Sequence, residues 1–299
     1  MAETVFSQMY AIMRESYPRF AELWAKSRQD FGPEWEKDFS QKISKLFGDT
    51  RNERWTFATD GYAEFCTDAL RAQVFFDKHG RYQASNYDDV FKNCYSNYDY
   101  MGKRYLPGQY LSHYVWPHHH SMLRRYLAKL PDFASGVKTF FEVGVGCGMY
   151  SHLTLEKMPG TKGTAFDISQ HSLDFAANVM KVNGLADRYS TRNCDIIKNP
   201  PSDKCDLIIC QEVLEHLEDP QLFIGALRNM TKENGLGYIT AAINAGHTDH
   251  IYLYRKPEEV QAQLEKAGWK ILDTHIEQAY PEKPEHQRPT IAGYFLRKV

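Results

Sequence analysis

Short apolar runs alternate with amphipathic stretches through the C-terminal half of the chain. The runs are rich in β-branched and aromatic residues and predict seven strands, over residues 139–143, 163–167, 189–193, 205–210, 237–242, 270–276 and 290–296. Apolar positions at helical spacing predict helices between most of them, over residues 150–157, 171–183, 221–229 and 257–267. Regular alternation of strand and helix is typical of right-handed βαβ units, so we expect a mainly parallel sheet.

The connection before the last predicted strand breaks this alternation. Residues 277–288 show no helical pattern and contain Pro281 and Pro284. A connection without a crossover helix favours a hairpin-like return. We therefore expect the last strand to be antiparallel, which makes the predicted sheet mixed.

The N-terminal part of the chain carries helical patterns and few strand-like runs. A proline at the start and a glycine just past the end predict one helix from Pro33 to Gly48. Two further helices are predicted over residues 55–76 and 109–130, the second ending at Pro131. Residues 81–106 have no clean period, and we expect a loop or short helices there.

Composition separates the same two parts. Residues 1–135 hold 27 of the 41 aromatic residues, and the change of pattern falls near residues 131–136. We therefore predict a mainly helical, aromatic-rich domain over residues 1–135 and an α/β domain over residues 136–299. The chain is 42% hydrophobic, which excludes disorder as its dominant state.

Charge, hydropathy and cysteine usage exclude further classes of protein. The net charge of −2 gives no global attraction for nucleic acid or an anionic membrane, and no apolar run approaches the roughly 20 residues that cross a bilayer. The N-terminus carries Glu3 and no basic stretch before an apolar one, so we expect no secretory signal. Six irregularly spaced cysteines without a CxxC pair indicate reduced thiols in a cytoplasmic protein. The oligomeric state stays open, a homo-oligomer included.

A glycine-rich turn follows the first predicted strand. Gly144, Gly146 and Gly148 stand at alternate positions between this strand and a predicted helix. Glycines at such a turn allow unusual backbone angles and close approach of a ligand at the carboxyl ends of parallel strands. The spacing is G-x-G-x-G, and Met149 stands where the dinucleotide fingerprint G-x-G-x-x-G requires glycine. A dehydrogenase therefore remains an alternative only if the protein binds NAD.

Acidic residues stand at the ends of the next three predicted strands. Asp167 follows the glycine turn by about 20 residues, where a carboxylate can accept both hydroxyls of a ribose. Asp195 can accept from an exocyclic amine, and Ile168 and Ile196 can flank a purine. Glu212 ends the series after the fourth strand. Each acid alone also fits a helix cap or a loop charge, but their order favours a nucleoside site.

Together, these motifs resemble those of class I S-adenosylmethionine-dependent methyltransferases, over about residues 138–299. The resemblance is carried by residues 142–148, Asp167, residues 194–196 and residues 211–217. It implies an α/β fold with a Rossmann-like, seven-stranded mixed sheet, a reversed last strand and helices on both faces. The first 135 residues resemble no family.

The resemblance also implies roles for individual residues in binding the methyl donor, S-adenosyl-L-methionine. Glu142 and the three glycines would hold its methionine end, and Asp167 would hold its ribose. Asp195 and Ile196 would hold the adenine, and the backbone of Gln211 and Glu212 would line the pocket.

Histidines are the candidate catalytic residues. Methyl transfer is an in-line displacement, so alignment of donor and acceptor supplies much of the acceleration. An acceptor that must lose a proton also needs a base, a role that histidine suits near pH 7. We predict His216, His250 and His113 as candidates, with His247 and the run of residues 118–120 as alternatives, and a structural role as the competing interpretation for each.

The segment after the fourth predicted strand contains Glu212, Glu215 and His216, which also suit a hard divalent cation. It resembles the metal-binding segment of ubiquinone-pathway O-methyltransferases and of small-RNA 2′-O-methyltransferases, in which a further histidine follows the fifth strand. The same sequence motif is also common in methyltransferases that bind no metal. We therefore predict no metal and keep one alternative ligand set, namely Glu212, Glu215, His216 and His250.

The aromatic-rich helical half suits a cap over the acceptor. Aromatic residues concentrate just before the α/β half, at Tyr98, Tyr100, Tyr105, Tyr110, Tyr114 and Trp116. An aromatic pocket favours a small organic acceptor or, through cation–π contact, a methylammonium. We predict a methyltransferase acting on O or N of a small organic acceptor in a biosynthetic pathway. The alternatives are an RNA or protein methyltransferase with an N-terminal recognition domain, and a non-catalytic donor-binding partner protein.

Overall fold

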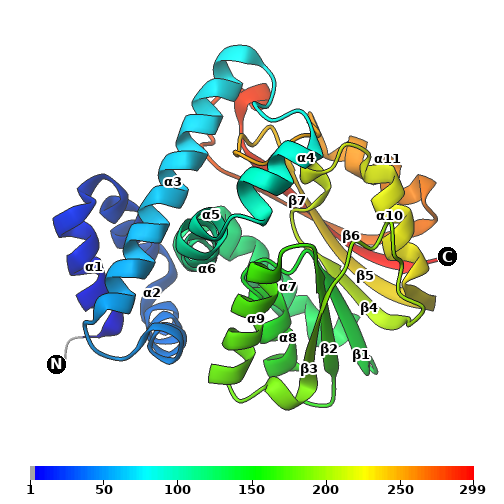
Figure 1. Cartoon of the computed structure of the whole chain (residues 1–299), viewed down its shortest axis with the longest axis horizontal. Coiled ribbons are helices and arrows are strands. Elements are labelled where there is room, and N and C mark those ends of the chain that lie inside the picture. The colour runs from blue at the N-terminus through cyan, green and yellow to red at the C-terminus, as the bar shows by residue number, and fades with distance from the viewer. Residues whose placement is uncertain (1–3) are drawn as a thin grey trace.

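The computed structural model describes residues 4–299 and contains a layer of long helices beside a seven-stranded sheet (Figure 1). Residues 1–3, which include the Glu3 used in the prediction about the N-terminus, lie outside the described residues. Within residues 4–299, no helix combines the length and the apolar character needed to span a bilayer.

Within residues 4–299, seven α-helices precede the sheet, joined in part by two π-helical turns over residues 91–95 and 101–105. They are α1 (Val5–Ser16), α2 (Pro18–Phe47), α3 (Glu53–His79), α4 (Tyr87–Val90), α5 (Tyr98–Tyr100), α6 (Leu106–Val115) and α7 (Pro117–Phe133). Gly32, at a φ of 77°, interrupts α2 just before Pro33 and so supports the predicted start there. Helix α3 covers the predicted helix and ends at Gly80 in the left-handed region.

The helix predicted over residues 109–130 is wrong in two respects. Trp116 has extended angles because it precedes Pro117, and it separates α6 from α7. Pro131 lies inside α7 and does not end it. It lies in the last turn, where a proline removes one hydrogen bond, and the Ala134 N–H still donates to the Leu130 carbonyl.

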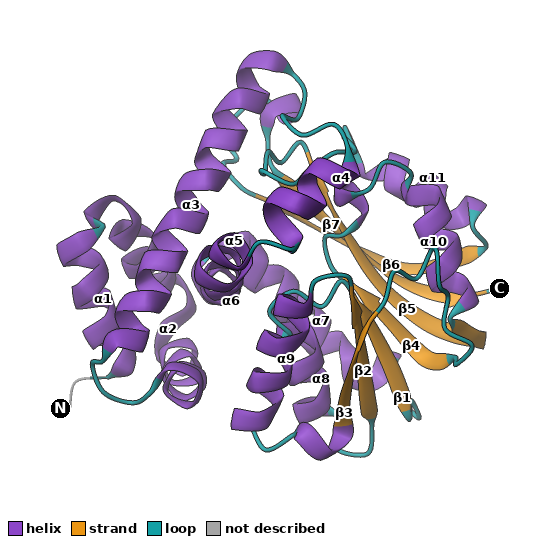
Figure 2. Ribbon diagram, in the orientation of Figure 1, coloured by secondary structure: helices purple, strands orange, loops and turns teal. Residues whose placement is uncertain are grey.

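The sheet has the strand order β3-β2-β1-β4-β5-β7-β6, with β7 antiparallel to both its neighbours (Figure 2). This confirms the predicted Rossmann-like mixed sheet with a reversed last strand. The strands are β1 (Thr139–Val143), β2 (Lys162–Asp167), β3 (Tyr189–Asn193), β4 (Cys205–Cys210), β5 (Thr231–Ile243), β6 (Trp269–Gln278) and β7 (Thr290–Lys298). The strand order places the carboxyl ends of β3, β2, β1 and β4 side by side.

Two hydrophobic cores cover the two faces of the sheet. Alternate strand residues point to opposite faces, so Phe140 and Phe141 enter different cores. One face packs against α10 (Pro220–Asn229) and α11 (Pro257–Lys266). The other packs against α7, α8 (Met149–Lys157) and α9 (Gln170–Val182).

The core on the second face continues without a break into the helical layer. It runs from Phe6 and Trp24, through Tyr110 and Tyr126, to Phe295 in β7. An ion pair joins the helical layer to the sheet domain at the same junction, between Lys42 of α2 and Glu156 of α8. The helical layer is therefore packed onto the sheet over a broad apolar surface.

Candidate functional site

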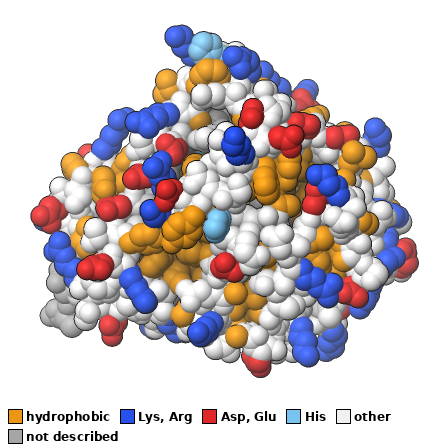
Figure 3. Space-filling model, viewed as in Figure 1, with side chains coloured by type: hydrophobic (Ala, Val, Ile, Leu, Met, Phe, Trp, Pro, Cys, Tyr) orange, Lys and Arg blue, Asp and Glu red, His pale blue; other side chains and the backbone are white. Residues whose placement is uncertain are grey.

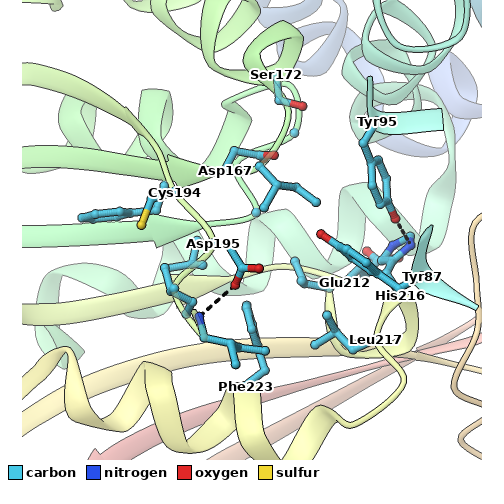
Figure 4. A pocket seen from close by; sticks show the side chains of 18 of the residues that line it. Tyr87, Tyr95, Asp167, Ser172, Cys194, Asp195, Glu212, His216, Leu217 and Phe223 are labelled. Atoms are coloured by element: carbon cyan, nitrogen blue, oxygen red, sulfur yellow. Dashed lines mark hydrogen bonds between the residues drawn. The ribbon is translucent and has the colours of Figure 1, made fainter. Parts of the chain in front are cut away.

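A cavity of about 430 Å³ lies at the carboxyl ends of β1 to β4 (Figure 4). The loops after these four strands form one side of it, and the segment from Tyr87 to Gln109 of the helical layer contributes to its wall. In Figure 4, Asp167 and Asp195 lie at neighbouring strand ends, and Tyr95 and His216 lie on the other side of the cavity.

The glycine turn leaves no room for side chains on the cavity wall. Gly144 and Gly146 line the cavity at φ angles of 72° and 49°. A Cβ atom on Gly144 would lie 2.3 Å from Val213 Cγ2, and one on Gly146 would lie 2.5 Å from Gln109 Oε1. Gly148 does not line this cavity and instead allows α8 to approach Ala176 of α9. The predicted contact of Gly148 with the donor stays a prediction.

Asp167 extends from the end of β2 into the cavity. Its Oδ1 accepts a hydrogen bond of 2.8 Å from the Ser169 N–H. Burial raises the pKa of this carboxyl to about 6, although backbone N–H groups around it oppose the shift. Ile168 and Ile196 line the same cavity.

Asp195 is fixed by the turn that follows β3. Its Oδ1 accepts from the N–H groups of Ile197 and Lys198, at 3.0 Å and 3.2 Å. Its Oδ2 lies 3.3 Å from Lys198 Nζ. The carboxylate therefore has a defined position at the β3 edge of the cavity.

A second cavity, of about 760 Å³, lies between the sheet and the helical layer. Its wall includes residues of α2, α3, α6 and α7 and of the connection between β6 and β7. Six residues line both cavities, namely Tyr105, Gln109, Gly144, Gln211, Glu212 and His216. The two cavities therefore meet where β1 and β4 end.

Glu142 lies on the side of the second cavity. It is 2% exposed, and its carboxylate accepts from the Ser151 N–H at 2.8 Å and from the Ser151 hydroxyl. Burial raises the pKa of Glu142 to about 8. Glu142 therefore anchors the start of α8 behind the glycine turn.

Glu212 and Gln211 form the floor between the cavities. Glu212 has a φ of 49°, which is unusual for a residue other than glycine, and its N–H donates to Thr240 Oγ1 at 3.0 Å. Burial raises the pKa of Glu212 to about 7. The side-chain amide of Gln211 is buried and has no hydrogen-bond partner among residues 4–299. The floor thus presents unsatisfied polar atoms where the cavities join.

Two of the three predicted catalytic histidines meet in one cluster around Asp249. His216 Nδ1 lies 2.9 Å from the Tyr95 hydroxyl and 3.4 Å from Asp249 Oδ2. The His250 ring lies 4.8 Å from the His216 ring, and its Nδ1–H donates to the Ala245 carbonyl. His113 lies elsewhere on the wall of the second cavity, beside Tyr150, where burial lowers its pKa to about 4.

His247 lies closer to the Asp249 carboxylate than His216 does. Its Nδ1 lies 2.6 Å from Asp249 Oδ1, and its Nε2 has no hydrogen-bond partner in the described part of the chain. Burial opposes the charged imidazole, yet Asp249 raises the pKa of His247 above its ordinary value. Burial likewise opposes the charge of Asp249, but the surrounding imidazoles of His216 and His247 hold its pKa well below the usual range.

Three of the four alternative metal ligands come together. Ligand atoms of Glu215, His216 and His250 all lie within 4.8 Å of one another, and Glu212 lies outside this group. Glu215 is fully buried, and neither carboxylate oxygen has a hydrogen-bond partner among the described residues. Burial raises the pKa of Glu215 well above its ordinary value.

A comparison with known protein families decides the class of this site. Residues 141–236 match the family model described as a methyltransferase domain. The C-terminal half therefore contains a methyltransferase domain. The match begins in β1 and includes the glycine turn, Asp167, Asp195 and Glu212.

Individual relatives of the methyltransferase domain point to one group of enzymes. The chain is 30% identical over 115 residues to a ubiquinone biosynthesis O-methyltransferase of Rickettsia felis, covering 38% of this chain and 46% of that protein. It is 29% identical over 166 residues to the enzyme of the same name from Rickettsia canadensis, covering 49% of this chain and 70% of that protein. The chain thus spans less than half of the first of these relatives.

A solved methyltransferase structure shares the fold of the methyltransferase domain. A putative sarcosine dimethylglycine methyltransferase from Galdieria sulphuraria superposes with a TM-score of 0.50 at 14% identity, covering 60% of this chain and 85% of that one. The N-methyltransferase NodS from Bradyrhizobium japonicum, in complex with S-adenosyl-L-homocysteine, gives 0.47 at 19% identity, covering 61% and 88%.

Three cavity-lining residues of the helical layer were not predicted from the sequence, namely Tyr87, Tyr95 and Gln109. Tyr87 and Tyr95 line the first cavity, and Gln109 lines both. Of the six aromatic residues predicted to cap the acceptor, Tyr105 and Trp116 line cavities, whereas Tyr110 and Tyr114 are buried in the core. No periodic pattern marks Tyr87 or Tyr95, because Tyr87 begins the four-residue helix α4 and Tyr95 ends a π-helical turn.

Proposed function

We propose that the protein is an S-adenosylmethionine-dependent methyltransferase that methylates an oxygen atom of a small organic acceptor in a biosynthetic pathway. The observation that carries this proposal is the junction of two cavities, one along the strand ends and one under the helical layer. The first has the acidic and apolar wall of a nucleoside site. The second has the size and the mainly apolar lining of a small-molecule site. The relatives named as O-methyltransferases support oxygen as the acceptor atom.

The residues of the first cavity fit the donor. When bound, the donor supplies a methyl group on a positively charged sulfur. Gly144 and Gly146 leave space for it beside the turn, and Asp167 can accept hydrogen bonds from its ribose. Asp195, Ile168 and Ile196 can hold its adenine.

The residues of the second cavity fit an acceptor that loses a proton. We propose His247 as the proton acceptor, because its free Nε2 belongs to a residue that lines this cavity and its Nδ1 is held by Asp249. A base that is oriented in this way by a carboxylate needs no large movement to act. His216 lies at the junction itself and remains the second candidate. The helical layer covers the cavity and so limits the access of water.

A divalent cation is a second candidate feature, favoured by the unpartnered Glu215 carboxylate. His250 has its Nδ1 bound to a backbone carbonyl, and His216 has its Nδ1 near Asp249, which leaves the Nε2 atoms for a ligand beside Glu215. Such outer partners are typical of metal-binding histidines. A cation held there would polarise an acceptor oxygen.

The cation proposal predicts binding of Mn²⁺ or Mg²⁺ that a Glu215→Gln variant loses, because the variant removes the anionic ligand. Isothermal titration calorimetry with each ion alone measures this binding. Glu218→Gln serves as a matched control, since Glu218 lies outside the cluster. Equal binding by the wild-type protein and the Glu215 variant, or no binding by either, would contradict the cation site.

The function is tested by titration and product analysis. We expect the purified protein to bind S-adenosylmethionine and S-adenosylhomocysteine and not NAD. We expect mass spectrometry to show a methylated product from a panel of phenols and catechols. Binding without any product would favour the non-catalytic donor-binding protein.

The remaining alternative, an RNA or protein methyltransferase, would yield its product on a macromolecule. Lys and Arg side chains are scattered among acidic ones over the face shown in Figure 3, which supports a small acceptor rather than nucleic acid. Methylation of RNA or protein, with no reaction on small molecules, would overturn the proposed acceptor class.

A further inference from the structure

A glutamine from the helical layer lies directly on the glycine turn. Gln109, in α6, accepts the Cys147 N–H at its Oε1 over 2.8 Å. The same amide group lies so close to Gly146 that an added Cβ there would be 2.5 Å from Oε1 and 2.9 Å from Nε2. The Nε2 group donates no hydrogen bond within residues 4–299, and Gln109 lines both cavities.

The strand order indicates which part of the donor meets this amide. Asp195 follows β3 and Asp167 ends β2, so the proposed adenine and ribose positions follow the order of the strands. The next strand is β1, whose glycine turn lies under Gln109. The part of the donor beyond the ribose, which is its amino acid, therefore reaches Gln109.

The charge distribution leaves the amino-acid carboxylate without a cationic partner. Lys198 is the one Lys or Arg among the described residues that line the first cavity, and it lies beside Asp195 at the adenine end. The six residues shared by the cavities include no Lys or Arg. A carboxylate there has no Lys or Arg to pair with among these six residues, and Gln109 Nε2 is a neutral N–H donor that can bind it.

We infer that Gln109 is a donor-binding residue supplied by the helical layer, with its Oε1 supporting the glycine turn and its Nε2 donating to the carboxylate of the donor's amino-acid portion. This inference rests on the proposed function. It makes the helical layer part of the donor site as well as the cover of the acceptor cavity. Donor binding and the docking of α6 are then coupled through one side chain.

The test compares two ligands that differ in the amino-acid portion. S-Adenosylhomocysteine carries the carboxylate, and 5′-methylthioadenosine has the same thioether nucleoside without it. The variant Gln109→Glu keeps an acceptor for the Cys147 N–H but replaces the amide donor by a carboxylate oxygen. Calorimetry should show S-adenosylhomocysteine binding weakened about 10- to 100-fold and 5′-methylthioadenosine binding changed less than about twofold.

Retained binding of 5′-methylthioadenosine also shows that the variant is folded. Gln41→Glu, an exposed position on α2 that lines neither cavity, is the matched control and should bind both ligands like the wild-type protein. Equal affinity of Gln109→Glu and wild type for S-adenosylhomocysteine would overturn the inference, as would equal weakening for both ligands, which assigns Gln109 to the turn alone. A wild-type protein that binds neither ligand would instead overturn the proposed function.

Discussion

Asp167 shows how burial sets the chemistry of a single residue. Its carboxyl lies inside the first cavity, and burial raises its pKa to about 6. A raised carboxyl pKa means that the folded protein holds this proton more tightly than the unfolded chain does. The ionised form therefore costs stability above the unfolded pKa, and a ligand that donates hydrogen bonds to the carboxylate offsets that cost.

The affinity for S-adenosylhomocysteine should consequently fall as the pH drops through about 6, because we propose that the ribose hydroxyls donate hydrogen bonds to the ionised carboxylate. Asp167→Asn should bind more weakly at neutral pH, by about tenfold or more, and should lose most of this pH dependence. Calorimetry between about pH 5 and about pH 8 measures both effects. Asp187→Asn, on an exposed turn, is the control. An identical pH profile for wild type and Asp167→Asn would remove Asp167 from the site.

A separate prediction concerns His247, the proposed proton acceptor. His247→Asn should lower kcat by about 10²- to 10⁴-fold, because the proton acceptor is lost, while donor affinity stays unchanged. Steady-state kinetics with an identified acceptor, together with calorimetry, separate these two quantities. His79→Asn at the exposed end of α3 should change neither. A kcat of His247→Asn equal to that of the wild type would instead assign the role of proton acceptor to His216.

The conformation and the surroundings of the glycine turn depend on three elements, namely β1, α6 and α8. Gly146→Val should abolish detectable donor binding, because φ is positive there and the side chain would meet the Gln109 amide. Gly160→Val, at a position with open space around it, is the control. Calorimetry with S-adenosylhomocysteine checks the result, and normal binding by Gly146→Val would contradict the placement of the donor beside this turn.

Sequence patterns predict some helices and strands of this chain and not others. The strands β1, β3 and β4 coincide with their predicted bounds, because each is a short run with clear turn residues on both sides. The break at Trp116 and the helical course through Pro131 depend on tertiary packing that no local pattern records. Gln109 stands 38 residues before the Cys147 N–H that it binds, and only the packing of α6 on the sheet brings them together.

The whole molecule is held by a core that runs from the helical layer into the sheet. We expect the two halves to unfold in one cooperative transition, since they share buried residues from Phe6 to Phe295. Trp24→Ala, a fully buried change in the helical layer, should lower stability by about 3–5 kcal/mol and move the whole transition. Differential scanning calorimetry checks this. Two separate transitions, with only the first shifted, would contradict it.

This continuity limits how the proposed enzyme could change its acceptor. Modules joined by a linker can be exchanged by recombination, because each brings its own interior. Here a foreign helical segment would have to match the apolar face of the sheet, side chain by side chain, before it could fold. New acceptor preferences should therefore arise by stepwise substitution along the wall of the second cavity, with the scaffold inherited intact.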